Sequence, residues 1–258
     1  MRLTLLGTGT SHGVPAIGCD CLVCRSTDPR NQRDRSSLFV QASTGEAVVV
    51  DTTPEFRRQC LRCDVRRVDA VLLTHPHADH IMGLDDLRRF NELQNGPVPV
   101  YGSPETLAIV RRAFAYAFEN QPVGPTRPLI ELRPFPAGPI CLGSLRITPL
   151  PCRHGPFNIH GFLFESERRR AAYFPDCNHL PPATLQQLAA LDVMILDGLR
   201  HEPHPTHFSL SESVTMLQRI GARRSFITHI SHALDHETTQ RSLPAGIEVP
   251  WDGLVVDL

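Results

Sequence analysis

The stretch "THPHADH" at 74–80 brings four metal-binding side chains together in the sequence: His75, His77, Asp79 and His80. Imidazole and carboxylate ligands together suit zinc, manganese or iron. The apolar run "AVLLT" directly before His75 predicts a buried strand, and open α/β sheets bind ligands beyond the carboxyl ends of their strands. The alternative is a solvated turn that is merely rich in histidine. Its position after a strand favours the metal interpretation, in which the cluster supplies part of the ligand set of two adjacent ions.

A second group of candidate ligands is "GCDCLVC" at 18–24, which contains Cys19, Cys21 and Cys24. Tetrahedral zinc takes four ligands, and no fourth cysteine follows nearby. The CxxC formed by Cys60 and Cys63 is one candidate for the fourth ligand. However, Phe56, Cys60 and Cys63 have the i, i+4, i+7 spacing of a helix's apolar stripe, and a buried free cysteine behaves as a small hydrophobe. Core packing is therefore the favoured role of Cys60 and Cys63, and the residues alone leave the fourth ligand open.

The strands that position these groups are indicated by short, almost continuous aliphatic runs, which are typical of strands covered on both faces. The runs lie at 2–7, 46–52, 68–75, 146–151, 191–197 and 225–229. Three of them end in a metal-capable residue, namely His75, Asp197 and His229. We expect these three strand ends to converge on one site.

Helical signals lie between the strand-like runs. A Ser-Pro-Glu start predicts a helix over about 103–119. Ser209 with Glu212 forms a capping box, and Gly221 ends that helix. A further amphipathic helix is predicted over 182–191. The alternation of strand and helix patterns indicates an α/β fold.

Two stretches separate these elements without splitting the chain. Segment 120–145 is rich in proline and glycine and is predicted to be a loop with room for one strand. The "RRR" at 168–170 lies between two strand-like runs and predicts a solvated hairpin turn. No linker that would split the chain is evident, so we expect one domain over 1–258.

Composition narrows the class of protein. The chain has 258 residues, 41% of them hydrophobic, and 26 basic against 27 acidic residues give a net charge of −1. This balance argues against a nucleic-acid partner. The sequence contains no lysine, which excludes Schiff-base and P-loop lysine chemistry. Eight cysteines accompany 13 histidines, and neither a signal-peptide h-region nor a membrane-length apolar run is present, so we expect a reduced, cytoplasmic metalloprotein without a membrane partner.

"HPHADH" resembles the HxHxDH motif of the metallo-β-lactamase-fold hydrolases, and the family's later motifs follow in order. They supply His154 in "PLPCRHG", Asp176 in "AYFPDCN" and His229 in "FITHISH". The resemblance implies a four-layer αββα sandwich with a binuclear centre. It assigns His75, His77 and His154 to the first metal, Asp79, His80 and His229 to the second, and Asp176 as their bridge. Asp51 in "VVVDTTP" matches the family's buried aspartate, which would orient a ligand.

Within this superfamily the chain resembles the PhnP-type cyclic-phosphate phosphodiesterases from end to end. The similarity includes "LGTGTSHGVPAIGCDCLVC" at the start and "LPAGIEVPWDG" near the end. In that group a structural zinc is held by three cysteines and a distant histidine, which here implies His232 as the partner of Cys19, Cys21 and Cys24. Such a closed shell keeps no position open for substrate, so its role is to brace the structure.

The resemblance also implies the reaction. Two divalent cations, manganese or zinc, would lie about 3.5–4 Å apart and hold a hydroxide for attack on a small cyclic phosphodiester of a sugar. Asp79 and Asp176 would serve this centre, and His207 would protonate the leaving group. The alternative for His207 is a capping or surface histidine. Arg153 and Arg88 would bind the substrate phosphate, and structural ion pairs are their alternative.

Rival interpretations remain on the same fold. They are an RNA 3′-processing nuclease, a thioesterase, a cofactor-biosynthesis relative, and a non-catalytic metal-binding protein. "GTSHG" at 9–13 also matches the GxSxG nucleophile elbow, but that elbow needs a helix directly after the serine, and "VPAIG" predicts a loop. A small phosphodiester is the expected partner, and a homodimer stays open.

Overall fold

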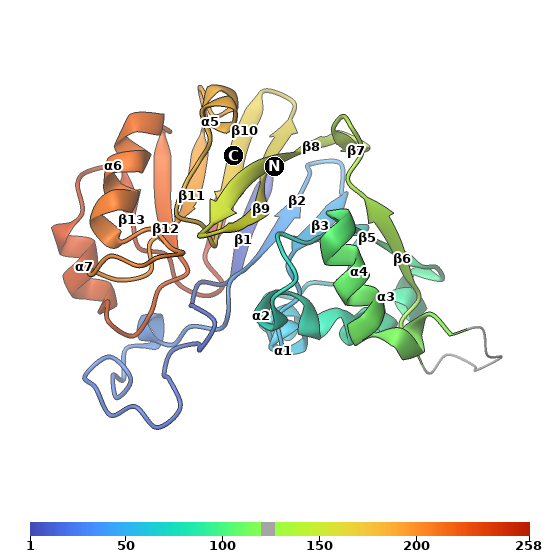
Figure 1. The fold of residues 1–258 in the computed structure, drawn as a ribbon, viewed down its shortest axis with the longest axis horizontal. Helices are drawn as coiled ribbons and strands as arrows, with labels where there is room; N and C mark the ends of the chain where they lie inside the picture. Colours follow the sequence, from blue (N-terminus) through green and yellow to red (C-terminus); the bar gives the residue numbers. More distant parts are fainter. Residues whose placement is uncertain (120–126) are drawn as a thin grey trace.

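The computed structural model describes residues 1–119 and 127–258, which form two face-to-face sheets with helices on both outer sides (Figure 1). Helices α1 to α4 lie beside the first sheet, and α5 to α7 lie beside the second (Figure 1). The expected αββα sandwich in a single domain is confirmed.

The first sheet is antiparallel at one edge and parallel at the other. Its strands, in spatial order, are β14 (Val255–Asp257), β1 (Arg2–Gly7), β2 (Ser37–Gln41), β3 (Ala47–Val50), β4 (Ala70–Leu72), β5 (Val98–Gly102) and β6 (Ile130–Pro134). The first and last strands of the chain are therefore neighbours, and Leu3 pairs with Val256.

The second sheet repeats this plan with a long antiparallel hairpin next to parallel strands. Its strands, in spatial order, are β13 (Ile247–Glu248), β12 (Arg224–Thr228), β11 (Val193–Asp197), β10 (Arg169–Phe174), β9 (Phe157–Ser166), β8 (Leu145–His154) and β7 (Ile140–Leu142). The parallel strands β10, β11 and β12 all direct their carboxyl ends to the same edge.

The helices are short and amphipathic. They are α1 (Phe56–Arg62), α2 (Ala78–Ile81), α3 (Leu87–Gln94), α4 (Pro104–Ala113), α5 (Pro182–Gln187), α6 (Leu210–Ile220) and α7 (His236–Ser242). Among the described residues, 3-10 turns accompany them at Pro29–Asn31, Met82–Asp86 and Ala115–Ala117. The predicted capping box of α6 is confirmed, with Gly221 in the left-handed conformation at its C-terminal cap.

Strand side chains alternate between two hydrophobic layers, which explains the continuous apolar runs. On β3, Val48 and Val50 pack between the two sheets, whereas Val49 packs under the helices of the first sheet. On β11, Ile195 points between the sheets and Met194 points to the helices of the second. Each fully buried aliphatic side chain stabilises the fold by about 1.5–3 kcal/mol relative to an exposed one. The two sheets therefore form a rigid platform for the residues at their ends.

Two predicted helices end earlier than expected. Helix α4 stops at Ala113 and not near Glu119, because the chain turns at Phe114 and buries this ring in the core before a short 3-10 turn. Helix α5 stops at Gln187, and Ala190 adopts a left-handed conformation with φ of 54°. In both cases burial of the next apolar residues overrides helix propensity.

The stretch 120–145 and the arginine run also differ in detail from expectation. The former contains two strands, β6 and β7, where room for one was predicted, and its residues 120–126 lie outside the described part. The hairpin turn is formed by Glu167 and Arg168, so Arg169 and Arg170 already belong to β10. No helix in the described ranges is long and apolar enough to cross a bilayer.

Candidate active site

The three polar strand ends meet, as expected. His75 follows β4 of the first sheet, whereas Asp197 and His229 end or follow β11 and β12 of the second. Asp197 pairs in register with Thr228, directly before His229, so the two side chains emerge from adjacent strands. The site is therefore built from the carboxyl ends of both sheets.

Two groups of donor atoms share one carboxylate. The first group contains His75, His77, His154 and Asp176, and the second contains Asp79, His80, Asp176 and His229. Within each group the donor atoms lie within 4.8 Å of one another. The structure thus brings together all seven residues of the expected binuclear set, with Asp176 at their junction.

The donor atoms are suited to hold cations. Both ring nitrogens of His229 are buried without a hydrogen-bond partner in the described structure. Such orphaned polar atoms are costly unless a ligand or ion satisfies them. Burial lowers the pKa of His75, and it lowers that of His229 to about 3, so both imidazoles are neutral and have a free lone pair. Nitrogen and oxygen donors of this kind fit a divalent metal.

Asp51 fixes the orientation of the histidine cluster through contacts with His80 and Thr74. Its Oδ2 lies 2.7 Å from His80 Nδ1, and its Oδ1 accepts a hydrogen bond of 2.9 Å from the Thr74 N–H. The Thr74 hydroxyl donates to Asp51 Oδ2 at 2.8 Å. Since Nδ1 of His80 is engaged, Nε2 faces the cluster. This arrangement agrees with the ligand-orienting role expected for Asp51.

His207 lies inside the site and is not a capping or surface residue. It is 9% exposed, and Ser209, not His207, caps α6. Its Nδ1 lies 2.7 Å from Asp197 Oδ2 and 3.0 Å from Asp176 Oδ1. Burial opposes its charge, but the Asp197 carboxylate raises the pKa of His207 to about 10. His207 and Asp197 therefore form a buried, oriented pair beside the shared carboxylate.

Asp197 is the residue whose role the sequence did not reveal. It is completely buried, and Oδ2 also accepts a 2.8 Å hydrogen bond from the Cys177 N–H, next to Asp176. Its strand-end position marked it as part of the site. Its pairing with His207 depends on the path of the loop after β11, which no local pattern indicates.

The two arginines expected at the substrate phosphate have structural partners. Arg153 Nη1 donates to Asn158 Oδ1 at 2.7 Å, and strand alternation places its side chain on the opposite face of β8 from His154. Arg88 forms an ion pair with Asp85 on the preceding turn and is 44% exposed. These contacts favour the structural alternative for Arg153.

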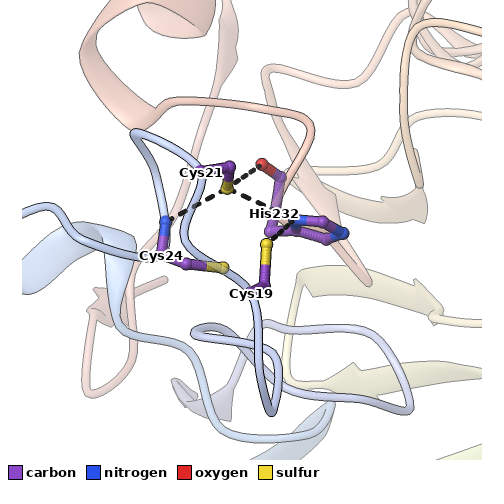
Figure 2. A group of neighbouring side chains, drawn as sticks. All are labelled: Cys19, Cys21, Cys24 and His232. Atoms are coloured by element: carbon purple, nitrogen blue, oxygen red, sulfur yellow. Dashed lines mark hydrogen bonds between the residues drawn. The ribbon is translucent and has the colours of Figure 1, made fainter.

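The three cysteines of the first loop surround His232 (Figure 2). Their four donor atoms lie within 4.8 Å of one another, and Cys19 Sγ and Cys21 Sγ are 3.3 and 3.4 Å from His232 Nδ1. The Cys24 N–H and His232 lower the pKa of the Cys21 thiol to about 6, which favours a thiolate. Cys60 is instead a residue of α1 whose side chain is buried in the core. The donor set fits tetrahedral zinc.

The cysteine loop is connected to the site through backbone hydrogen bonds. Thr10 N–H donates to the Ile230 carbonyl at 3.1 Å, and Ile230 N–H donates to the Thr8 carbonyl at 2.9 Å. On its other side Gly9 packs closely against Arg33, since a Cβ there would lie 2.9 Å from Arg33 Cβ. Residues 11–28 contain no helix, so the nucleophile elbow is excluded.

Comparison with known proteins agrees with this geometry. Residues 46–230 match the model of the β-lactamase superfamily domain. A solved structure described as a new diphosphatase from the PhnP family is 42% identical, with a TM-score of 0.91 over 100% of this chain and 97% of that one. The chain belongs to the PhnP family of this superfamily. It is a metal-dependent hydrolase.

Two other proteins extend the comparison of this PhnP-family hydrolase. An octanoyltransferase of Porphyromonas gingivalis (strain ATCC BAA-308 / W83) is 35% identical over 257 residues, or 98% of this chain and 51% of that protein. The chain thus spans about half the length of that relative. Zinc-bound PqqB from Methylobacterium extorquens shares the fold, with 21% identity and a TM-score of 0.84 over 100% of both chains.

Proposed function

We propose that this PhnP-family hydrolase is a phosphodiesterase that cleaves a small cyclic phosphodiester of a sugar with the help of two divalent cations. The observation that carries the proposal is the shared carboxylate of Asp176, which belongs to two complete ligand groups and lies 3.0 Å from His207. Hydrolysis of a phosphodiester needs charge stabilisation at phosphorus and a proton for the leaving oxygen, and this arrangement offers both.

Manganese or zinc ions in the two groups would neutralise charge on the phosphoryl oxygens and lower the pKa of water for attack on phosphorus. The chain's own part is to fix the ligand positions. His75, His77 and His154 would hold the first ion, and Asp79, His80 and His229 the second. Asp51 keeps the ring of His80 directed into the cluster. Asp176 belongs to both groups and so fixes their positions relative to one another.

His207 would act as the general acid. Its Nδ1 is engaged by Asp197, so Nε2–H is the proton that can be donated to the departing sugar alkoxide. The negative charge of Asp197 favours the protonated imidazole and holds its orientation, the role that a carboxylate has in other histidine pairs.

The Cys19, Cys21, Cys24 and His232 group would hold a structural zinc. His232 lies three residues beyond His229, so one turn serves both metal groups. A zinc here would fasten the first loop of the chain to the turn that carries His229 and keep that ligand in place.

A panel of substrates tests the proposal. The metal-loaded protein is expected to hydrolyse sugar cyclic phosphates and bis(p-nitrophenyl) phosphate, and Asp176→Ala is expected to abolish both activities. An acyl thioester is the appropriate competing substrate, because the P. gingivalis relative is an octanoyltransferase. Thioester hydrolysis without phosphodiester hydrolysis would replace the proposal with a thioesterase, and no hydrolysis by fully metallated protein would favour a non-catalytic role.

A further inference from the structure

The loop between β11 and α6, residues 198–209, carries three histidines, and the proposed reaction uses one of them. His201 is exposed, His204 is partly buried, and His207 lies in the site beside Asp176. The ring centroids of His204 and His207 are 4.9 Å apart, and the two ring planes are inclined by 45°. His204 is therefore a second imidazole at the candidate site, and it reaches the solvent while lying next to the proposed acid.

Contacts of the neighbouring backbone hold His204 in place. The Thr206 carbonyl lies 3.0 Å from Nδ1 of the proposed ligand His154. The Pro205 carbonyl accepts a hydrogen bond of 2.7 Å from Asn178 Nδ2, in the turn after β10. A proline on each side of His204 further restricts the backbone. The fold thus fixes the position of this imidazole relative to the metal groups.

The proton of His204 can be placed from its neighbours. The backbone N–H of Thr206 can only donate, and it lies 3.4 Å from His204 Nδ1, which the Thr206 hydroxyl also approaches at 3.1 Å. Nδ1 is therefore the acceptor, and the neutral ring carries its hydrogen on Nε2. Burial and the charge of His207 lower the pKa of His204, which agrees with a neutral ring. Within the described part of the chain Nε2 has no hydrogen-bond partner, so its N–H is available to a ligand.

An available N–H donor beside the general acid is suited to the alcohol side of a phosphodiester. The metal groups neutralise the phosphoryl oxygens, whereas the departing sugar oxygen must lie against His207. The sugar that carries this oxygen then lies within reach of the neighbouring imidazole. We propose that His204 is a substrate-binding residue whose Nε2–H donates a hydrogen bond to an oxygen of the sugar and so holds the leaving group next to His207. The inference rests on the proposed function, because the phosphate in the metal groups determines where the sugar lies.

Binding to the metal-loaded protein tests this role without requiring turnover. Ribose 5-phosphate and inorganic phosphate share the phosphoryl group, and only the first offers sugar oxygens, so calorimetric titration with both isolates the contact to the sugar. His204→Ala should weaken the binding of ribose 5-phosphate about three- to tenfold, the usual effect of one hydrogen bond, and leave inorganic phosphate unchanged. His204→Gln should restore most of the affinity, because its amide again supplies an N–H donor. A purely structural role of the imidazole would change both affinities.

His201→Ala is the matched control, because His201 is an exposed histidine of the same loop, and it should change neither affinity. An equal loss of both ligands in His204→Ala, or no loss of ribose 5-phosphate, would overturn the inference. In hydrolysis of a ribose cyclic phosphate, His204→Ala should raise KM by the same factor with kcat nearly unchanged, the pattern of lost binding and not of a lost acid. Failure of the wild-type protein to hydrolyse this ester and bis(p-nitrophenyl) phosphate would refute the proposed function, whereas the titrations would still decide the role of His204.

Discussion

Removal of His207 is expected to separate proton transfer from metal binding. His207 lies outside the two four-residue groups that make up the seven proposed ligands, although it also lies close to Asp176, Asp197 and His229. Its Nδ1 is held 2.7 Å from Asp197 Oδ2. His207→Ala should therefore keep its metals while losing the proton donor. Activity on esters with a poor leaving group should fall by about 10²–10⁴-fold, the usual contribution of a general acid. A nitrophenolate departs without a proton, so bis(p-nitrophenyl) phosphate should be affected far less.

In the Asp197→Asn variant, the loss of activity on esters with a poor leaving group should depend on pH. The acid works only when protonated, so its contribution is lost as the pH rises through the pKa of His207. That pKa is about 10 next to the Asp197 carboxylate. Without the carboxylate it should fall towards the ordinary value of about 6.5, and the protonated share should then drop about fourfold at pH 7 and about 300-fold at pH 9. The loss on poor leaving groups should therefore grow steeply between these two pH values.

The assay compares a ribose cyclic phosphate with bis(p-nitrophenyl) phosphate in wild-type protein and both variants. Elemental analysis confirms equal metal content before the rates are compared. Equal losses on the two substrates in His207→Ala, or a pH-independent loss in Asp197→Asn, would refute the role of His207 as the acid and reduce it to a structural residue.

The other predictions concern the zinc group and the stability of the fold. Cys21→Ser and His232→Ala should each lose about one zinc per chain and unfold at a lower temperature, whereas Cys60→Ala should keep its zinc. Metal analysis that finds the zinc retained in the first two variants would contradict the assignment. His236 Nδ1 accepts a hydrogen bond from Arg33 Nη2 at 3.2 Å, and burial lowers the pKa of His236 to about 4. The free energy of unfolding should therefore be highest above pH 6.5 and should decrease as the pH falls towards 4. At pH 5 the decrease should be about 2 kcal/mol. Urea unfolding of wild type and His236→Asn at pH 7.5 and pH 5 measures this term, and an identical pH dependence of the two proteins would show that it is absent.

Much of the fold could be predicted because its signals are local. The capping box of Ser209 and Glu212 sets the start of α6, and Gly221 sets its end through a left-handed conformation that few other residues adopt. The ends of α4 and α5 could not be predicted in the same way. Phe114 leaves the helix because its ring packs in the core, against residues that include ones distant in the sequence.

The candidate site likewise combines residues that local sequence patterns reveal with residues whose positions depend on distant parts of the chain. His75, Asp197 and His229 could be grouped from the sequence because each ends an apolar, strand-like run. In the structure the strands of these runs pair in parallel with their neighbours, and their carboxyl ends meet at the site. The opposite directions of Arg153 and His154 follow from strand alternation, but only once the register of β8 is known. The pairing of His207 with Asp197 carries no local signal, since it depends on the path of the loop after β11.

The closure of the first sheet by β14 and of the cysteine group by His232 has a consequence for biosynthesis. During synthesis β1 and the three cysteines emerge from the ribosome long before their partners, Val256 and His232. His229 likewise follows the "THPHADH" cluster by more than half of the chain. Until these later segments have emerged, β1 lacks its edge neighbour, and the groups that need His229 and His232 each lack a ligand. These two groups can therefore be completed only after His229 and His232 have been synthesised, and a chain without zinc would keep its first loop unattached and open to proteolysis.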